Sequence, residues 1–278
     1  MAQEYAITEL CQVLEVARSG YYRWRRGQVT ARAVANGKLV EHIQSIHQAK
    51  RGIYGSPRIT RELRRAGHKC NHKRVERLMR EHGVQGRSAR KRKVKTTDSD
   101  HDQPIAPNLL RGRPAPQRTD EVWVADITYI PTAQGWLYLA AVMDLYSRVI
   151  LGWSLWRRLH AGGALQALNR ALLNRHYPRG LIHHSDQGIQ YASREYRQRL
   201  EQYDFLASMS RKGNCYDNAA MEAFWSTLKR EALEDSGQWS EDKVRRVIFE
   251  YIEAIYNRSR LHSSLDYQSP VDFENQSK

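Results

Sequence analysis

Three acidic residues occupy positions where an acid is unexpected. Asp126 interrupts the apolar stretch 122–130, "VWVADITYI". A carboxylate buried alone in such a strand is costly unless it is paired or bound to a metal. Asp186 ends the short apolar segment "LIHHSD", and Glu222 lies one turn into the predicted helix "AAMEAFWSTLKREAL". Any one of these acids is most simply structural, but the three together indicate a shared site.

The type of ligand suggests the chemistry of that site. Oxygen ligands without thiolates or paired imidazoles favour Mg²⁺ or Mn²⁺. Two such ions suit in-line displacement at phosphorus, because one activates the attacking oxygen and the other stabilises the leaving oxygen. We therefore expect Asp126, Asp186 and Glu222 to be catalytic and to hold two ions, Mg²⁺ or Mn²⁺.

Asp144 is the rival of these acids for a place beside Asp126. If strands 122–130 and 136–144 pair through the intervening turn, Ala140 faces Asp126 and Asp144 faces Val122. That offset is four residues, or roughly 13 Å along the strand. Two ions bridged by shared carboxylates lie only about 3.5–4 Å apart. We therefore expect Asp144 to serve the following turn.

The elements that must position these acids begin after residue 119. The pattern predicts three antiparallel strands within 122–156, a helix over 161–175, a strand at 181–186, a helix over 193–202, a strand at 205–210 and two further helices. This order predicts an α/β ribonuclease-H-like catalytic core, a mixed five-stranded sheet with helices, preceded by a small all-α helix-turn-helix region. We expect a DNA-binding region at 1–86, a basic, Pro-rich linker at 87–118 and the core with its C-terminal helices at 119–278.

Charge is distributed unevenly along the 278 residues, whose net charge is +15. Residues 1–95 contain 23 Lys and Arg against 7 Asp and Glu, whereas residues 96–278 contain 22 against 23. A surface that is merely soluble would spread its charge more evenly. The basic front therefore predicts a nucleic-acid partner.

Two segments of the basic front have helix-turn-helix character. The first is "ITELCQVLEVARSGYYRWRRG", in which Leu10, Val13 and Leu14 repeat at helical spacing. The second, "GSPRITRELRRAGHKCNHKRVERLMREHGV", has Ser56 as a predicted N-cap and Asn71 as the cap of a second helix. A bundle with solvated arginines is the alternative to DNA binding. We expect DNA contacts from Arg58, Arg61, Arg64, Arg65, Lys73, Arg74 and Arg77.

The cysteine content and the apolar segments indicate in which cellular compartment the protein works. The three cysteines, Cys11, Cys70 and Cys215, lie far apart and form neither a disulfide framework nor a zinc-binding pair. No stretch approaches the ~20 apolar residues of a membrane span. The first residues also lack the pattern of a secretory signal. We expect a protein of a reducing cytoplasm.

The spacing of the acids resembles that of the DDE transposases and retroviral-type integrases. Asp186 and Glu222 are separated by 35 residues, with Asp126 upstream. The segments "WVADITYI", "VMDLYSRVILGW", "IHHSDQGIQYAS", "SMSRKGNCYDNAAMEAFWSTLK" and "YNRSRLHSSL" together resemble the second-reading-frame (orfB) transposases of the insertion-sequence-three family. "YGSPRITRELR" is similar to the helix-turn-helix segment of that family. The resemblance covers nearly the whole chain.

The resemblance implies roles for individual residues. It makes the three acids the metal-binding catalytic triad and Lys229 the basic residue that grips DNA near the site. Asn218, one turn before Glu222, either orients that acid or caps its helix. His183 and His184 are expected to support the site or to pack. Further residues match the C-terminal motif of the family without an assigned role: Tyr256, Asn257, Arg260 and His262.

The resemblance also implies that the cytoplasm is bacterial and that the protein is associated with the nucleoid, and it implies partners. These are DNA, as terminal inverted repeats and as target, a homo-oligomer on DNA, and the product of an upstream reading frame (orfA) or a frameshift fusion with it. Two readings stay open beside a transposase: a sequence-specific DNA-binding regulator with an inactive integrase-like core, and a plain nuclease of the same fold. An inverted repeat flanking the gene would separate the transposase from both.

Overall fold

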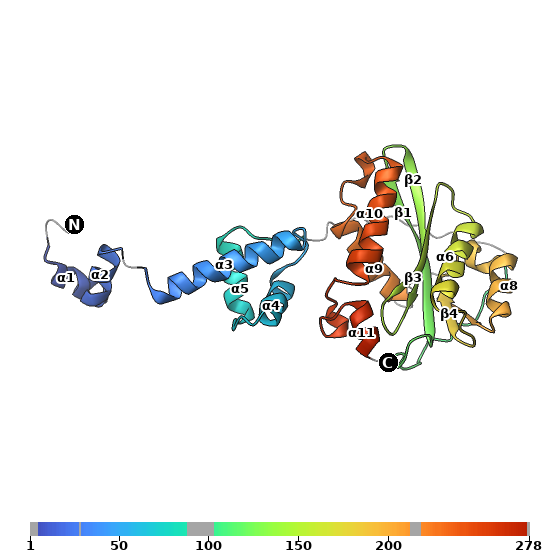
Figure 1. The fold of residues 1–278 in the computed structure, drawn as a ribbon, viewed down its shortest axis with the longest axis horizontal. Helices are drawn as coiled ribbons and strands as arrows, with labels where there is room; N and C mark the ends of the chain where they lie inside the picture. The colour runs from blue at the N-terminus through green and yellow to red at the C-terminus, as the bar shows by residue number, and fades with distance from the viewer. Residues whose placement is uncertain (1–4, 28, 88–102, 212–217, 277–278) are drawn as a thin grey trace. The chain divides into compact units, whose positions relative to one another are not determined.

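A computed structural model describes residues 5–27, 29–87, 103–211 and 218–276 (Figure 1). The chain divides into two compact units, residues 1–86 and 87–278. No helix in the described ranges is long and apolar enough to cross a membrane.

The first unit is helical in its described part. Its helices are α1 (Ile7–Val13), α2 (Arg18–Arg25), α3 (Ala31–Ala49), α4 (Ser56–Arg65) and α5 (His72–Glu81). Apolar side chains at helical spacing in α3, α4 and α5 are buried, among them Ile43, Leu63 and Val75. In α1 only Cys11 is buried, and Val13 and Leu14 are 81% and 68% exposed. The helix predicted from the apolar spacing of the first segment is therefore present. Its apolar side chains at Val13 and Leu14 are not buried against any described part of the chain.

The helix ends correct one predicted cap. Asn71 caps α5 as predicted, because its side chain accepts a hydrogen bond from Arg74 N. The prediction for Ser56 is wrong: Gly55 is the N-cap of α4, and Ser56 is its first residue. The Ser56 hydroxyl instead hydrogen-bonds His72 Nε2 at 3.0 Å, which joins α4 to α5.

The second unit is built on a five-stranded mixed sheet, as predicted. The strands are β1 (Val122–Thr132), β2 (Gly135–Asp144), β3 (Ile150–Trp156), β4 (Ile182–Ser185) and β5 (Leu206–Met209), in the order β3-β2-β1-β4-β5. The first three are antiparallel, and β4 and β5 run parallel to β1 and to each other. The strand that carries Asp126 is therefore the centre of the sheet.

The register of the first hairpin differs by one residue from the predicted one. Asp126 faces Ala141, and Asp144 faces Trp123, because Thr132 pairs with Gly135 across a two-residue turn. The predicted pairing required an odd number of residues in the loop. Asp144 still lies three residues from the level of Asp126, about 10 Å along the strand. Its carboxylate accepts hydrogen bonds from backbone N–H groups of the adjoining turn and of Asp120, so its predicted turn role is confirmed.

Helices cover both faces of the sheet (Figure 1). One face packs against α6 (Ala161–Asn174), α7 (Ile189–Ala192) and α8 (Arg194–Gln202), and the other against α9 (Ala219–Glu231) and α10 (Glu241–Glu250). Side chains alternate along β1: Trp123 and Ala125 belong to the first core, and Val122 and Val124 to the second. Asp126 has the parity of Val124 and therefore points toward α9.

Shorter elements complete the unit. The chain continues from α10 into a π-helical turn, η3 (Tyr251–Tyr256), and ends in η4 (Ser263–Leu265) and α11 (Pro270–Gln276), with η2 (Ser236–Gln238) before α10. The described part of the predicted linker, residues 103–118, packs against the sheet. Leu109 N donates to Ser208 Oγ at 2.9 Å, and Pro107 O accepts from Met209 N. This part therefore belongs structurally to the second unit.

Candidate active site

Asp126 is held at the centre of the sheet by two hydrogen bonds. Its Oδ1 accepts from Ile127 N at 2.8 Å, and its Oδ2 accepts from Trp225 Nε1 at 2.9 Å. The pKa of Asp126 is raised to about 7, mainly by burial. Repulsion from the Asp186 carboxylate contributes to this rise, and repulsion from the Glu222 carboxylate contributes less. The two hydrogen bonds oppose this shift. Burial and like charges together shift pKa values in this way at functional sites.

Asp186 follows directly from the strand beside β1. The parallel register pairs Val122 with Ile182 and Val124 with His184. The pairing ends there, and Asp186 follows the last residue of β4, Ser185. Asp186 lies close enough to Asp126 for its carboxylate to raise the pKa of Asp126. Asp186 Oδ1 accepts a hydrogen bond from Gly188 N at 3.0 Å. A Cβ at Gly188 would lie 2.9 Å from that oxygen, so glycine gives the Asp186 carboxylate its room.

Glu222 lies in the first turn of α9, and its side chain is exposed. No three His, Cys, Asp or Glu side chains among the described residues are grouped closely enough to hold one ion. The arrangement therefore brings Asp126 and Asp186 together, and it places Glu222 on the helix that faces them. It does not close all three into one ligand cluster.

Lys229 lies on α9, and Asn218 is the N-cap residue of that helix; both are near β1. Asn218 Nδ2 donates to Ala125 O at 3.2 Å, and its side chain does not cap the helix. Asn218 is thus the N-cap residue of α9, but its side chain binds the backbone of β1 in place of the capping hydrogen bond, and in the described part of the chain it forms no hydrogen bond with Glu222. The Lys229 ammonium lies 5.6 Å from the centroid of the Tyr129 ring. Burial lowers the pKa of Lys229, and the Asp126 carboxylate opposes that shift.

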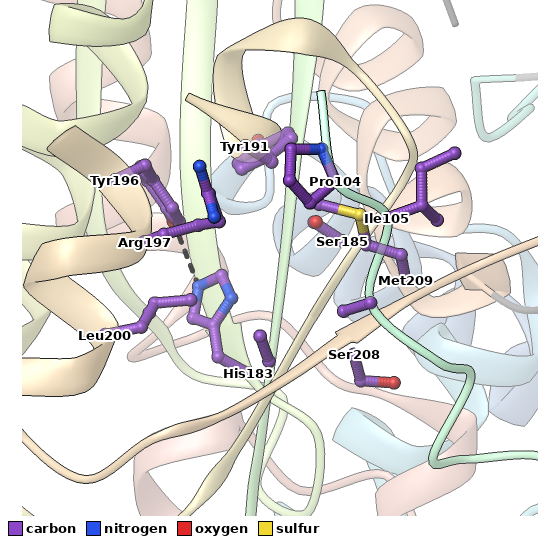
Figure 2. Close-up of a pocket in the computed structure, with 12 residues that line it drawn as sticks. Pro104, Ile105, His183, Ser185, Tyr191, Tyr196, Arg197, Leu200, Ser208 and Met209 are labelled. Carbon is purple, nitrogen blue, oxygen red and sulfur yellow. Dashed lines mark hydrogen bonds between the residues drawn. The ribbon is translucent and has the colours of Figure 1, made fainter. Parts of the chain in front are cut away.

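The two histidines of β4 are buried and hydrogen-bonded away from the acids. His183 Nε2 lies 3.0 Å from Tyr196 Oη, and His184 Nδ1 lies 2.8 Å from Ser208 Oγ. Burial lowers the pKa of His183 to about 3, so this imidazole stays neutral. His183 also lines a cavity of about 130 Å³ beside Tyr196 and Arg197 (Figure 2). These contacts fit packing and support of β4 rather than metal binding.

The C-terminal motif fastens other elements to one another. The Asn257 side chain pairs with both backbone groups of Ile150, at 2.9 and 3.0 Å. Arg260 is ion-paired with Glu231 at the end of α9. The Tyr256 ring packs edge-on against Phe224 of the same helix, with 4.7 Å between ring centroids. The His262 ring in turn packs against Tyr256. The motif thus anchors the helix that carries Glu222.

The predicted DNA-contact residues of the first unit differ in accessibility. Arg64, Arg65 and Lys73 are exposed, whereas Arg58, Arg61, Arg74 and Arg77 are half-buried. Internal contacts engage several of them: Arg64 Nε donates to Cys70 O, Arg74 Nε donates to Asn36 Oδ1, Arg77 pairs with Glu81, and the Arg58 guanidinium lies over the Tyr54 ring.

Two residues of this arrangement were not expected. Arg80 is exposed at the end of α5 and was not among the predicted contacts, although its charge and helical position could have indicated it. Trp225 contacts Asp126 directly. Its position three residues after Glu222 was the available signal, because residues three apart share a helix face.

Comparisons with known proteins agree with this architecture. Residues 116–215 and 203–270 each match an integrase core domain family, and residues 35–92 match an HTH-like domain. The "Insertion element IS600 uncharacterized 31 kDa protein" of Shigella sonnei is 44% identical over 95% of this chain and 97% of its own. "Transposase InsF for insertion sequence IS3A" of Escherichia coli (strain K12) is 39% identical over 98% and 95%, respectively.

The chain is also similar to solved structures of viral proteins. One is a simian T-cell lymphotropic virus intasome in complex with PP2A regulatory subunit B56 gamma, which is 14% identical, with a TM-score of 0.48 over 84% of this chain and 74% of that one. Another is the HTLV-2 integrase catalytic core domain in complex with magnesium, in its trimeric form, which is 12% identical, with a TM-score of 0.43 over 57% of this chain and 98% of that one.

Proposed function

The chain belongs to the insertion-sequence transposases of the IS3 family, and from this premise we propose that Asp126, Asp186 and Glu222 catalyse its cleavage and joining of DNA. A helix-turn-helix-like domain for DNA binding and an integrase core make DNA transposition its function. The finer assignment concerns the reacting groups, the metal and the partners.

The observation that carries this assignment is the pairing of Asp126 with Asp186. The Asp126 carboxylate on β1 and the Asp186 carboxylate, directly after β4, repel each other, and burial of Asp126 increases the free energy of its charged form. A bound divalent cation would relieve both effects. The donors are carboxylate oxygens, the ligands that Mg²⁺ and Mn²⁺ prefer. Asp126 and Asp186 therefore fit the expected metal, and we assign Glu222, on the facing helix and outside that pair, as the third ligand.

The proposed reaction has two steps at phosphorus. In the first, a water oxygen attacks a phosphodiester at the element's end, and the 3′-oxygen leaves as a hydroxyl. In the second, that 3′-hydroxyl attacks a phosphodiester of the target and forms a new P–O bond, while the bond to the target strand's own 3′-oxygen breaks and that oxygen leaves as a hydroxyl. Two divalent ions, when bound, supply activation of the attacking oxygen and stabilisation of the leaving oxygen.

The chain's own residues bind and orient the DNA in both steps. Lys229 lies on the helix of Glu222, where its ammonium would contact a phosphate next to the reacting one. The basic helices α4 and α5 would bind the terminal inverted repeats of the element. We further propose that the protein acts on nucleoid DNA as a homo-oligomer, together with the upstream-frame protein or fused to it.

A cleavage assay on labelled DNA tests the proposal. The substrate carries the element's end, and the reactions contain Mg²⁺ or Mn²⁺, with and without the upstream-frame protein. Metal-dependent nicking at the end, followed by strand transfer, is the expected result. Binding without products in every reaction would instead identify a regulator with an inactive core. Equal degradation of unrelated DNA would identify a plain nuclease.

A further inference from the structure

The indole of Trp225 connects the helix of Glu222 to the strand of Asp126. Trp225 is only 6% exposed, and its Nε1–H donates to Asp126 Oδ2 at 2.9 Å. A buried indole N–H requires a partner, and a charged acceptor makes the stronger bond. With Ile127 N on the other oxygen, both oxygens of Asp126 are fixed in direction. Each oxygen retains a lone pair for a cation.

Helix α9 is attached to β1 on both sides of Glu222. Asn218 lies one turn before Glu222 and donates to Ala125 O, the carbonyl next to Asp126. Trp225 lies one turn after Glu222 and donates to Asp126 itself. Residues at these spacings share one face of a helix. The two hydrogen bonds therefore set where the Glu222 backbone lies relative to the Asp126 carboxylate.

Trp225 also packs as a core residue. Its ring lies 4.7 Å from the Phe224 ring between centroids, within the core that α9 shares with the sheet. A purely structural role would need this apolar contact and not the N–H. Phenylalanine at position 225 keeps most of the aromatic contact and removes only the donor, so the two roles can be separated.

We propose that Trp225 is a positioning residue, whose indole N–H orients the Asp126 carboxylate for the divalent cation and fixes its separation from Glu222. This inference rests on the proposed function of these acids as metal ligands. Groups that hydrogen-bond a metal ligand typically account for about 10–100-fold in metal affinity or activity. Without the N–H, the Asp126 carboxylate turns about its side-chain bond, and it binds the cation less tightly.

Mn²⁺ binding by Trp225→Phe tests the inference. Free Mn²⁺ is measured by electron paramagnetic resonance during titration of the full chain with end DNA bound, and cleavage is followed against Mn²⁺ concentration. We expect the Mn²⁺ concentration at half-saturation to rise about tenfold or more, and the affinity for DNA to stay the same. Trp156→Phe is the matched control, because it removes an indole donor to Gln166 instead.

The outcomes separate the inference from the proposed function. If the wild type binds no Mn²⁺ and cleaves no DNA, the proposed function fails, and the inference fails with it. If the wild type is active and Trp225→Phe matches it in both readouts, Trp225 only packs, and the inference alone is overturned.

A measurement on otherwise intact protein covers the case in which Trp225→Phe unfolds. The Nε1–H signals of ¹⁵N-labelled tryptophan are recorded for the wild type and for Asp126→Ala. The inference predicts that one indole signal moves and exchanges faster with solvent in the variant. Unchanged indole signals would overturn it.

Discussion

Arg260 donates two hydrogen bonds, each 2.8 Å long, to the carboxylate of Glu231, and both side chains are buried. Tyr251 Oη donates a third to the same carboxylate at 2.7 Å. Glu231 is the last residue of α9, so this ion pair fixes the end of the helix opposite to Glu222. Arg260 of the C-terminal motif, whose role the sequence leaves unassigned, thus anchors the end of α9 inside the protein.

Arg260→Met should therefore destabilise the protein strongly. The change leaves the buried Glu231 carboxylate without its two shorter bonds from Arg260, and with Arg230 at 3.5 Å. Breaking a buried ion pair by removing one partner typically costs about 3–5 kcal/mol. Urea unfolding measures the loss. Arg157→Met is the control, because Arg157 pairs with Glu241 at the surface, where a pair contributes about 0–1 kcal/mol. Equal losses in the two variants would show that the buried pair does not anchor α9.

The raised pKa of Asp126 predicts that the difference in stability between Asp126→Asn and the wild type depends on pH. It is about 7 in the folded protein, against an ordinary value of 3.8. Between these values the folded protein holds a proton that the unfolded chain has released, so stability falls as the pH rises. The side-chain amide introduced by Asp126→Asn cannot ionise. Both proteins are measured in EDTA. The melting temperature of Asp126→Asn minus that of the wild type should be several degrees more positive at pH 8 than at pH 4. A difference independent of pH would contradict the raised pKa.

Lys229→Ala should weaken DNA binding through the loss of one phosphate contact. The slope of log affinity against log salt concentration should become shallower by about one. Fluorescence anisotropy across a salt series measures this slope. Lys243→Ala is the control, because it also removes an ammonium that lies over an aromatic ring. The Lys243 ammonium is 4.1 Å from the Trp239 ring centroid. An unchanged slope in Lys229→Ala would remove Lys229 from the DNA interface.

Lys73→Ala should reduce binding to the element's end. Lys73 is exposed in the first turn of α5. Loss of a phosphate contact there should weaken binding to end DNA and to unrelated DNA about equally, whereas loss of a base contact should cost about 1–3 kcal/mol on end DNA alone. Glu76→Ala on the same helix controls for helix stability. Unaltered affinity for both DNAs would exclude Lys73 from the interface.

The succession of strands and helices along the chain could be predicted because it depends on local patterns. The change from helical to strand periodicity is visible in "VWVADITYI", and its interruption by Asp126 marks the site. The Asn71 cap is equally local. These features need only neighbouring residues, so the sequence alone was sufficient for them.

Apart from the Ser56 cap, which is displaced by one residue, the errors concern pairings and contacts that the local apolar pattern does not determine. The hairpin register depends on whether the turn has an even or an odd number of residues, and the apolar pattern does not determine that number. The Asn218 side chain was expected to orient Glu222 or to cap its helix. It instead donates a hydrogen bond to a carbonyl 93 residues away in the chain. Trp225 and Asp126 are separated by 99 residues. Their hydrogen bond follows only from the packing of α9 on β1.

The central claim is that the acids catalyse strand cleavage and transfer, and Glu222→Gln tests it most directly. The substitution removes the charge of an exposed side chain, so the fold and the affinity for end DNA should remain those of the wild type. Labelled end DNA with Mg²⁺ or Mn²⁺ is incubated with each protein, and cleaved and joined products are counted. We predict that both products disappear in Glu222→Gln while DNA binding is retained. Wild-type amounts of both products from the variant would contradict the account.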